Sequence, residues 1–199
     1  IKKKKMLSYE ESLKILKESN ALLDGHFILS SGLHSAQYVQ CAQLLSKPYK
    51  SAIFCKSLAE KISNEFKEID LILSPAMGGV VIGYEIGRLL NIETIFSERV
   101  EGRFNLRRDF KILKDAKVLI VEDVITTGKS SIECSKLVEI ADAEVIGFAC
   151  LIDRSNGNST VSKKIVSQIE INISTYKEND LPENLISLPS TKPGSRKLK

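Results

Sequence analysis

The chain has 199 residues, of which 43% are hydrophobic and 27% are charged, and its formal net charge is +4. This length is enough for one domain with a sizeable core, and the composition is ordinary for a globular protein. The charge excess is mild, no apolar stretch approaches the length of a membrane span, and no signal peptide is visible. We therefore expect neither a nucleic-acid nor a membrane partner.

The four cysteines are scattered, without Cys-x-x-Cys spacing and without a histidine at metal-ligand spacing: Cys41, Cys55, Cys134 and Cys150. Cys134 and Cys150 fall within apolar segments, which predicts that they are small core residues. This usage is typical of a reducing cytoplasm, where we expect the protein to work. The basic runs at residues 2–5 and 196–199 indicate solvated ends.

The first elements in chain order are a helix and a hairpin. Ser8 and Glu11 match a capping box, which predicts a helix that begins here and ends near Asn20. Residues 25–40 predict a β-hairpin that turns around the Ser-Gly pair at positions 31 and 32. Both histidines of the chain lie in this hairpin, and we interpret them as surface or structural residues.

A second helix is predicted to begin at Pro48, with an apolar stripe that faces the core: Ala52, Ile53, Leu58, Ala59, Ile62 and Phe66. A buried strand at residues 71–73 then leads into the loop Ser-Pro-Ala-Met-Gly-Gly at 74–79 and a helix over 80–90. The adjacent glycines allow a ligand to approach the backbone closely. A plain strand-to-helix turn is the alternative, and a Gly-x-Gly-x-x-Gly fingerprint is absent.

A third strand is predicted at residues 93–96, and a basic segment of weak periodicity follows at 97–110. It holds four arginines: Arg99, Arg103, Arg107 and Arg108. A long loop inside a compact α/β domain is often an active-site lid, although a solvated surface loop is the alternative. Because the arginines should repel one another unless an anion gathers them, we expect a mobile loop that becomes ordered over an anionic ligand.

The most informative stretch is at residues 118–130. Four aliphatic residues are typical of a strand buried on both faces, the acids Glu122 and Asp123 follow, and a Thr-Thr-Gly-Lys-Ser turn then enters a helix. A turn at a helix N-terminus aims unpaired N–H groups at an anion, and Gly128 permits positive φ. This order predicts a pocket for one phosphate group. The carboxylates suit sugar hydroxyls or a Mg²⁺ that keeps much of its water.

Two other interpretations of this stretch are weaker. An ordinary α/β crossing is disfavoured because an acid pair at the end of a buried strand is costly to place without a use. Gly128, Lys129 and Ser130 match the end of a nucleotide triphosphatase P-loop, but that motif needs a glycine at the position of Asp123.

The last predicted strands lie at residues 144–152 and 165–173, the second at a sheet edge. Arg154 follows the first of them. An arginine at the C-terminal edge of a parallel strand faces the ligand crevice, and its planar fork suits a carboxylate. A surface ion pair with Asp153 is an equal alternative.

Residues 118–130 resemble the phosphoribosyl-diphosphate signature of the type I phosphoribosyltransferases. The pattern Phe-x-Leu-x-Ser-Gly-x-x-Ser at residues 27–35 is similar to the N-terminal hood of the orotate phosphoribosyltransferases. The resemblance covers residues 22–196. It implies one α/β domain over 1–199 with the type I phosphoribosyltransferase fold. We expect a parallel sheet flanked by helices in a core at about 48–154, and a small hood from about 20–45 and 155–190.

The resemblance also implies transfer of ribose 5-phosphate from 5-phosphoribosyl 1-diphosphate to orotate in UMP synthesis. The products are orotidine 5'-monophosphate and diphosphate, and the expected enzyme is a Mg²⁺-dependent, monofunctional homodimer. The implied catalytic residues are Glu122, Asp123 and Arg99, with Asp123 contacting the metal directly or through water. The implied contacts of phosphoribosyl diphosphate are Glu122, Asp123, Val124, Ile125, Thr126, Thr127, Gly128, Lys129, Ser130, Met77, Gly78, Gly79, Arg99 and Arg103. Thr126 and Arg154 are implied to bind orotate.

The chain departs from this family's pattern at three places. Many relatives have a lysine at the position of Ser30, another near Gly78, and lysines and a histidine in the basic segment; roles of those residues do not carry over. Two alternatives stay open. The orotate-like hood and Arg154 argue against a purine or other base phosphoribosyltransferase. The lack of a visible DNA-binding element argues against a non-catalytic regulator that senses phosphoribosyl diphosphate.

Overall fold

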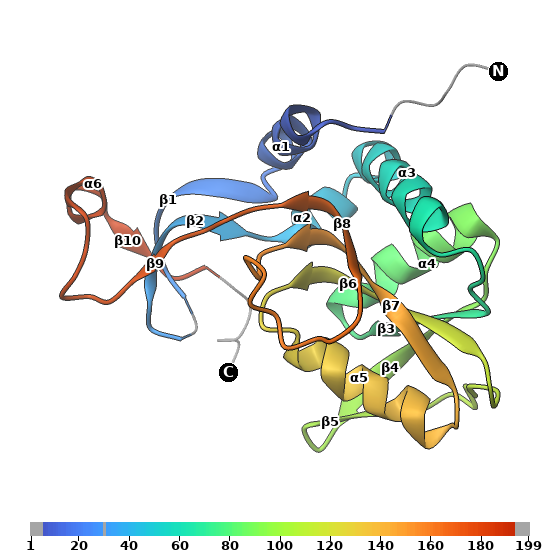
Figure 1. Cartoon of the computed structure of the whole chain (residues 1–199). Helices are drawn as coiled ribbons and strands as arrows, with labels where there is room; N and C mark the ends of the chain where they lie inside the picture. The colour runs from blue at the N-terminus through green and yellow to red at the C-terminus, as the bar shows by residue number, and fades with distance from the viewer. Residues whose placement is uncertain (1–5, 30, 194–199) are drawn as a thin grey trace.

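The computed structural model describes residues 6–29 and 31–193, which form two β-sheets (Figure 1). The basic ends at 2–5 and 196–199 and the position of Ser30 lie outside the described residues. The larger sheet has the strand order β5 (Arg103–Leu106), β4 (Thr94–Val100), β3 (Leu71–Pro75), β6 (Lys117–Ile125), β7 (Glu144–Asp153) and β8 (Ile165–Glu170). The smaller sheet, the hood, has the order β10 (Ser190–Thr191), β1 (Leu22–Ile28), β2 (His34–Val39) and β9 (Thr175–Tyr176).

Six helices occur in the described residues: α1 (Tyr9–Glu18), α2 (Cys41–Leu45), α3 (Pro48–Glu65), α4 (Gly78–Leu90), α5 (Lys129–Ile140) and α6 (Glu183–Ile186). None of these helices has both the length and the apolar character that crossing a membrane requires. The four cysteines are all buried and unpaired, as the two in apolar segments were predicted to be.

Helices cover both faces of the larger sheet, whose strands are parallel except for β5 (Figure 1). In β6, Leu119 and Val121 pack in the core that includes α3 and α4, whereas Val118 and Ile120 pack in the core that includes α5. The unbroken aliphatic run of β6 is needed because both of its faces are buried. The predicted α/β fold with a parallel sheet flanked by helices is confirmed.

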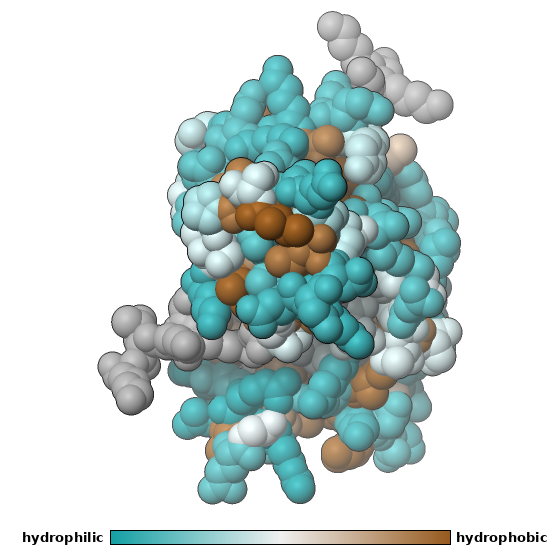
Figure 2. All heavy atoms as spheres, turned by 90° about the vertical axis from the view of Figure 1, so that its left-hand side faces the viewer, coloured by the Kyte–Doolittle hydropathy of each residue, from teal (hydrophilic) through white to brown (hydrophobic). Residues whose placement is uncertain are grey.

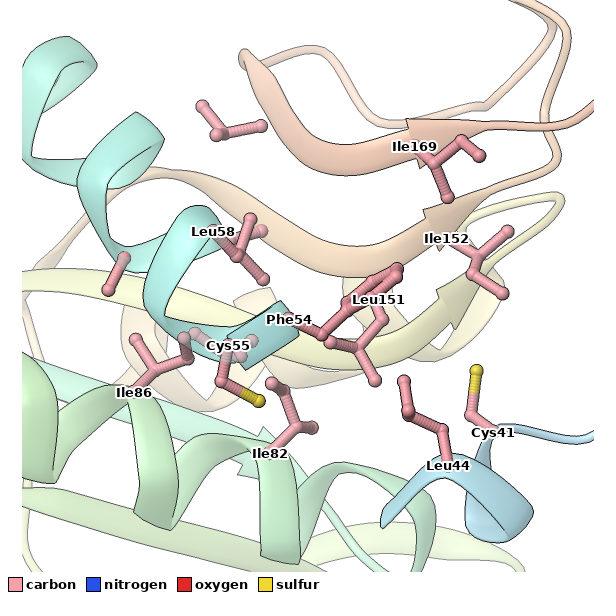
Figure 3. Close-up of a cluster of buried hydrophobic side chains, with 14 of the residues drawn as sticks. Cys41, Leu44, Phe54, Cys55, Leu58, Ile82, Ile86, Leu151, Ile152 and Ile169 are labelled. Carbon is pink, nitrogen blue, oxygen red and sulfur yellow. The ribbon is translucent and has the colours of Figure 1, made fainter. Parts of the chain in front are cut away.

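The apolar face of α3 that packs on α4 differs in part from the predicted one. Phe54 of α3 is fully buried, and Figure 3 shows it in one cluster with Ile82 and Ile86 of α4. Ala52 and Ile53, which were predicted to face the core, are exposed; Ile53 is 53% exposed. That part of the prediction was wrong because the buried face of α3 begins with Ser51, Phe54 and Cys55, and Ala52 and Ile53 do not lie on this face.

The segment at residues 97–110 was predicted to be a long loop, and that prediction was wrong for residues 97–106. β4 runs on to Val100 and pairs antiparallel with β5. The connecting residues Glu101 and Gly102 both have positive φ, 50° and 81°, as a two-residue hairpin turn of type I′ requires. Phe104 of β5 is only 7% exposed, so one side of this hairpin packs on the core.

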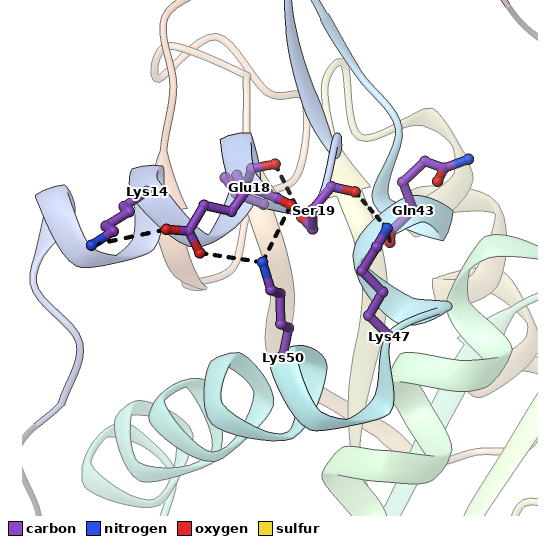
Figure 4. A network of polar contacts seen from close by, with 7 residues as sticks. Lys14, Glu18, Ser19, Gln43, Lys47 and Lys50 are labelled. Carbon is purple, nitrogen blue, oxygen red and sulfur yellow. Dashed lines mark hydrogen bonds and ion pairs between the residues drawn. The ribbon is translucent and has the colours of Figure 1, made fainter.

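Polar contacts join α1 to the helices that follow the hood hairpin. The predicted capping box at Ser8 is present. At the other end of α1, Lys50 Nζ lies 3.2 Å from Glu18 Oε2, and Lys47 Nζ donates to the carbonyl of Ser19 at 2.7 Å (Figure 4). These bonds fix α1 and the start of the hood against α2 and α3.

The hood is completed by distant parts of the chain. The predicted hairpin of β1 and β2 is present; β10 pairs with β1 and β9 pairs with β2. β8 lies within the segment expected for the hood but pairs with β7 in the larger sheet. His26 and His34 are buried structural residues, with His26 Nε2 2.6 Å from His34 Nδ1.

The outer end of the hood is partly apolar. Figure 2 shows hydrophobic surface among hydrophilic side chains at this end of the molecule. Ile186 and Leu188, in and after α6, are exposed apolar residues of this part of the chain.

Candidate active site

The acid pair lies inside β6, not after it. Glu122 is in register with Cys150 of β7, and the strand continues to Ile125. The predicted strand end at Val121 was therefore too early, because pairing with β7 extends the strand past the acids. The carboxylates consequently lie on a rigid element close to the C-terminal ends of the parallel strands, where open α/β sheets bind their ligands.

Glu122 is a buried carboxyl with a hydrogen-bond partner that sequence reasoning missed. It is 8% exposed, and Ser131 Oγ of α5 donates to its Oε1. Burial raises the pKa of Glu122 to about 7; the Ser131 bond lowers it, the charge of Asp123 raises it, and the charge of Arg99 lowers it. The helical position of Ser131, in the first turn of α5, was the only signal available for this contact.

Asp123 lies directly against the glycine loop between β3 and α4. A Cβ placed on Gly78 would lie 2.7 Å from Asp123 Oδ2, a contact that real Cβ atoms do not make. The other oxygen, Oδ1, accepts from the backbone N–H of Val124 at 2.9 Å. Burial raises the pKa of the Asp123 carboxyl, and the bond from Val124 opposes this shift.

The glycine loop opens α4 two residues earlier than predicted. Met77 is 84% exposed, and Gly79 packs so closely on β6 that its Cβ would lie 3.1 Å from the carbonyl oxygen of Val121. The peptide bond between Ala76 and Met77 is cis. Exposed backbone at 77–78 therefore lies beside the Asp123 carboxylate.

The turn between β6 and α5 has the predicted form. Gly128 has φ of 80° and precedes α5, which has no side-chain cap. Thr126, Thr127 and Lys129 are exposed, and Ser130 is half-buried. The first turn of a helix leaves N–H groups unpaired, so this exposed turn suits an anion.

Arg154 follows β7 and lies beside this turn, since its backbone N–H donates to the carbonyl of Ile125 at 2.8 Å. Its Nε is buried and has no hydrogen-bond partner among the described residues. Burial lowers the pKa of Arg154, and the hood residue Tyr38 is close enough to act in the opposite direction. Asp153 Oδ1 instead accepts from the N–H of Ser155 at 2.7 Å, so the alternative of an ion pair with Asp153 is not seen.

The arginines of the β4–β5 hairpin are mostly paired with acids, so the prediction of mutual repulsion was wrong. Arg99 lies 2.8 Å from Glu133 of α5 and stacks on the ring of Phe104 at 4.0 Å. Two other arginines, Arg107 and Arg108, share Glu98 at 3.9 and 3.1 Å. Arg103 is exposed and has no ion pair with another described residue.

Comparisons with known proteins agree with this geometry. A family model described as phosphoribosyl transferase domain matches residues 43–184. The orotate phosphoribosyltransferase of Erythrobacter litoralis is 46% identical over 188 residues, covering 94% of this chain and 97% of the relative. The chain belongs to the orotate phosphoribosyltransferase family. The orotate phosphoribosyltransferase of Parvibaculum lavamentivorans is also 46% identical, over 96% of this chain and 98% of its own length.

Solved structures of the orotate phosphoribosyltransferase family share the fold. The crystal structure of the Aeropyrum pernix orotate phosphoribosyltransferase has a TM-score of 0.65 and 23% identity to this chain. The match covers 80% of this chain and 93% of that one. At this identity the likeness establishes the fold, including the helix-flanked sheet that holds Glu122 and Asp123.

Few protein side chains at this site could ligate a metal ion, so a bound substrate would have to supply the other ligands. No group of three or more His, Cys, Asp or Glu side chains in the described part of the chain could enclose an ion. The Asp123 carboxylate faces the glycine loop, and Glu122 is its neighbour. One or two carboxylates beside bound phosphates suit Mg²⁺, which keeps several waters; the residues present fit this ion.

Proposed function

We propose that the chain transfers ribose 5-phosphate from 5-phosphoribosyl 1-diphosphate to orotate, giving orotidine 5'-monophosphate and diphosphate. The observation that carries this proposal is the contact between the Asp123 carboxylate and Gly78. In this proposal Asp123 is a sugar-binding acid, and the glycine loop at 77–79 and the turn at 126–130 are the anion-binding segments on either side of it. A phosphorylated ribose with a diphosphate on its anomeric carbon has its charged groups in the same order.

In this proposal each segment holds one part of the substrate. The backbone of residues 124–128 with Lys129 and Ser130 binds the 5-phosphate, and residues 77–79 bind the diphosphate. Glu122 and Asp123 accept hydrogen bonds from the ribose hydroxyls, which the burial of both carboxyls would strengthen. Arg99, whose charge already acts on Glu122, adds positive charge near the ribose.

Orotate would bind between the hood and the end of β7. The unpaired Nε of Arg154 is a buried donor beside the turn that contains Thr126, and a planar guanidinium matches a carboxylate. This favours orotate over a purine, which has no carboxylate. The two orotate phosphoribosyltransferases that are 46% identical to this chain also support orotate as the substrate.

The reaction would be a displacement at the anomeric carbon through an oxocarbenium-like state. Mg²⁺, when bound at Asp123, would offset negative charge on the leaving diphosphate. The residues of this chain would hold the ribose in place, supply basic groups to the diphosphate, and keep water from the reacting carbon. We assign no proton transfer to the hairpin, since it has no histidine.

We also propose a cytoplasmic homodimer. Two helices that pack together, α3 and α4 (Figure 3), leave apolar side chains exposed: Tyr49 and Ile53 on α3, and Val81 and Tyr84 on α4. Burying such side chains against a second copy is favourable. Met77, at the start of α4, is also exposed, so the neighbour would lie close to the diphosphate loop. Four unpaired cysteines favour a reducing compartment.

A single assay tests the proposed function. Orotate absorbance is followed with phosphoribosyl diphosphate and Mg²⁺, and adenine and hypoxanthine are offered in place of orotate. We expect orotate consumption that ceases with EDTA and is reduced on the order of a hundredfold by Asp123→Asn, as loss of a charged hydrogen bond implies. Near-normal turnover in Asp123→Asn, or a preference for a purine, would contradict the proposal. Binding of phosphoribosyl diphosphate without turnover would favour the non-catalytic sensor.

A further inference from the structure

The loop between β7 and β8 holds one carbonyl of the phosphate turn with two hydrogen bonds. The backbone N–H of Thr160 donates to the carbonyl oxygen of Thr127 at 3.0 Å, and Thr160 Oγ1 donates to the same oxygen at 2.8 Å. Both donors come from one residue, 33 positions along the chain from its acceptor. No local sequence pattern predicted this contact.

The orientation of this carbonyl fixes the direction of the next N–H. A trans peptide is planar, and its C=O and N–H groups point in opposite directions. Since the carbonyl of Thr127 points toward Thr160, the N–H of Gly128 points away from Thr160. Gly128 has φ of 80° and immediately precedes α5, so its N–H adds to the unpaired donors at the start of that helix.

The same loop contacts the turn at two further points. A Cβ on Gly128 would lie 3.0 Å from Val161 Cγ1, so Val161 packs directly on the turn. At the start of the loop, Arg154 donates its N–H to Ile125 at 2.8 Å. The loop at residues 154–161 therefore contacts the turn at both of its ends, at Ile125 and at Gly128.

We propose that Thr160 is a positioning residue for the 5-phosphate of the substrate. By holding the Thr127 carbonyl on the outside of the turn, it keeps a negative carbonyl end away from the phosphate and the Gly128 N–H directed at it. The proposal rests on the proposed function, because it takes the turn at 126–130 as the 5-phosphate site. It goes beyond it in assigning this role to a residue that does not touch the substrate.

The test compares two anions that occupy different parts of the site. Ribose 5-phosphate reports on the turn at 126–130, and diphosphate with Mg²⁺ reports on the loop at 77–79; both are titrated by calorimetry, which needs no turnover. Thr160→Val removes the hydroxyl donor and keeps the shape and the backbone donor. Thr160→Ser restores the hydroxyl. Ser162→Ala, at an exposed position in the same loop, is the matched control.

We expect Thr160→Val to raise the Kd for ribose 5-phosphate about two- to tenfold, the usual effect of one neutral hydrogen bond, and to leave the Kd for diphosphate unchanged. In the turnover assay the KM for phosphoribosyl diphosphate should rise and the KM for orotate should not. Thr160→Ser and Ser162→Ala should match the wild-type protein.

Three results would overturn the role of Thr160: an unchanged Kd for ribose 5-phosphate in Thr160→Val, an equal loss for both anions, or a wild-type protein that binds no ribose 5-phosphate. The proposed function fails separately. A wild-type protein that binds ribose 5-phosphate in a Thr160-dependent way but does not consume orotate would contradict the activity and support the positioning role.

Discussion

The carboxylate of Asp123 lies against Gly78, so closely that a side chain at residue 78 would require the carboxylate to move. A Cβ there would lie 2.7 Å from Oδ2 and 2.8 Å from Oδ1. The acid comes from β6, one of the two central strands of the larger sheet, and the glycine comes from the first turn of α4. This contact couples the ribose half of the proposed site to the diphosphate half.

Gly78→Ala should therefore displace Asp123. We expect the KM for phosphoribosyl diphosphate to rise at least about tenfold, because a charge-assisted contact of roughly 1.5 kcal/mol or more is lost when the acid moves. Steady-state kinetics with each substrate varied in turn measures this effect. The stability of the metal-free protein should fall as well, since the carboxylate is forced from its place.

A double-mutant cycle separates this contact from other effects of the alanine. In the background of Asp123→Ala the clash is absent, and alanine within a helix is favoured over glycine by roughly 0.5–1 kcal/mol. Gly78→Ala should then be neutral or stabilising in urea unfolding. A loss of stability of the same size in both backgrounds would contradict the contact as the cause.

The sequence was sufficient for the framework of this site and insufficient for its contacts. The aliphatic run before Glu122 and the Thr-Thr-Gly turn predicted a buried strand and an anion-binding helix start, because both depend on local pattern. The contact of Asp123 with Gly78 joins segments 45 residues apart and depends on how β3 packs beside β6, which no local pattern encodes. The same holds for Thr160 and Thr127.

The β4–β5 hairpin shows a different reason for failure. Its turn, Glu101-Gly102, is a weaker signal than Asn-Gly, and the charged residues Glu98, Arg99 and Arg103 lie in its strands on both sides of that turn. The arginines suggested an open loop only because Glu98 and Glu133 were not recognised as their partners. Ion pairs with Glu98 and Glu133 allowed this basic segment to form a regular hairpin.

Glu122→Gln should stabilise the metal-free protein in a pH-dependent way. Burial raises the pKa of Glu122 in the folded protein to about 7, from an ordinary value of 4.5. Between these values the folded state keeps the proton and the unfolded state loses it, so the wild-type protein loses stability as pH rises from about 4.5 to 7. Glutamine carries no charge at any pH and can still accept the bond from Ser131.

The gain from Glu122→Gln should therefore be on the order of 2–3 kcal/mol at pH 8 and should shrink toward zero as pH falls to 4.5. Urea unfolding in EDTA at pH 5 and pH 8 measures it. Glu139→Gln, at an exposed position on the same helix α5, is the control and should change stability much less. A gain that is equal at both pH values would show that burial does not shift the titration of Glu122.

Arg154→Ala should affect orotate more than phosphoribosyl diphosphate. The side chain has a buried Nε without a partner, so its removal breaks no described hydrogen bond of that atom and should cost little stability. The KM for orotate should rise about ten- to a hundredfold, and Arg154→Lys should recover only part of this because it lacks the fork. An equal rise in both KM values would mean that Arg154 is structural.

The last prediction concerns the arginines of the hairpin and the proposed dimer. Arg99 is exposed but is paired with Glu133 and stacked on Phe104, and its charge acts on Glu122 of the same chain. Arg103 lies beside the turn of the hairpin, is exposed, and pairs with no described acid. We therefore predict that Arg103 is the arginine of this hairpin that acts in the site of a neighbouring subunit.

Mixing two impaired variants, Asp123→Asn and Arg103→Ala, tests this placement. If Arg103 acts across the dimer, a mixed dimer contains one site with both Asp123 and the partner's Arg103 intact. Random exchange of subunits makes half of the dimers mixed, so activity should rise to about a quarter of the wild-type value. In the control experiment Arg107→Ala takes the place of Arg103→Ala, because the side chain of Arg107 is near Glu98. The Arg107→Ala variant should be active before mixing. If activity stays at the average of the two parents after mass spectrometry confirms exchange, Arg103 acts in its own site. The hairpin would then serve the acid pair of its own chain, to which the ion pair between Arg99 and Glu133 of α5 already holds it.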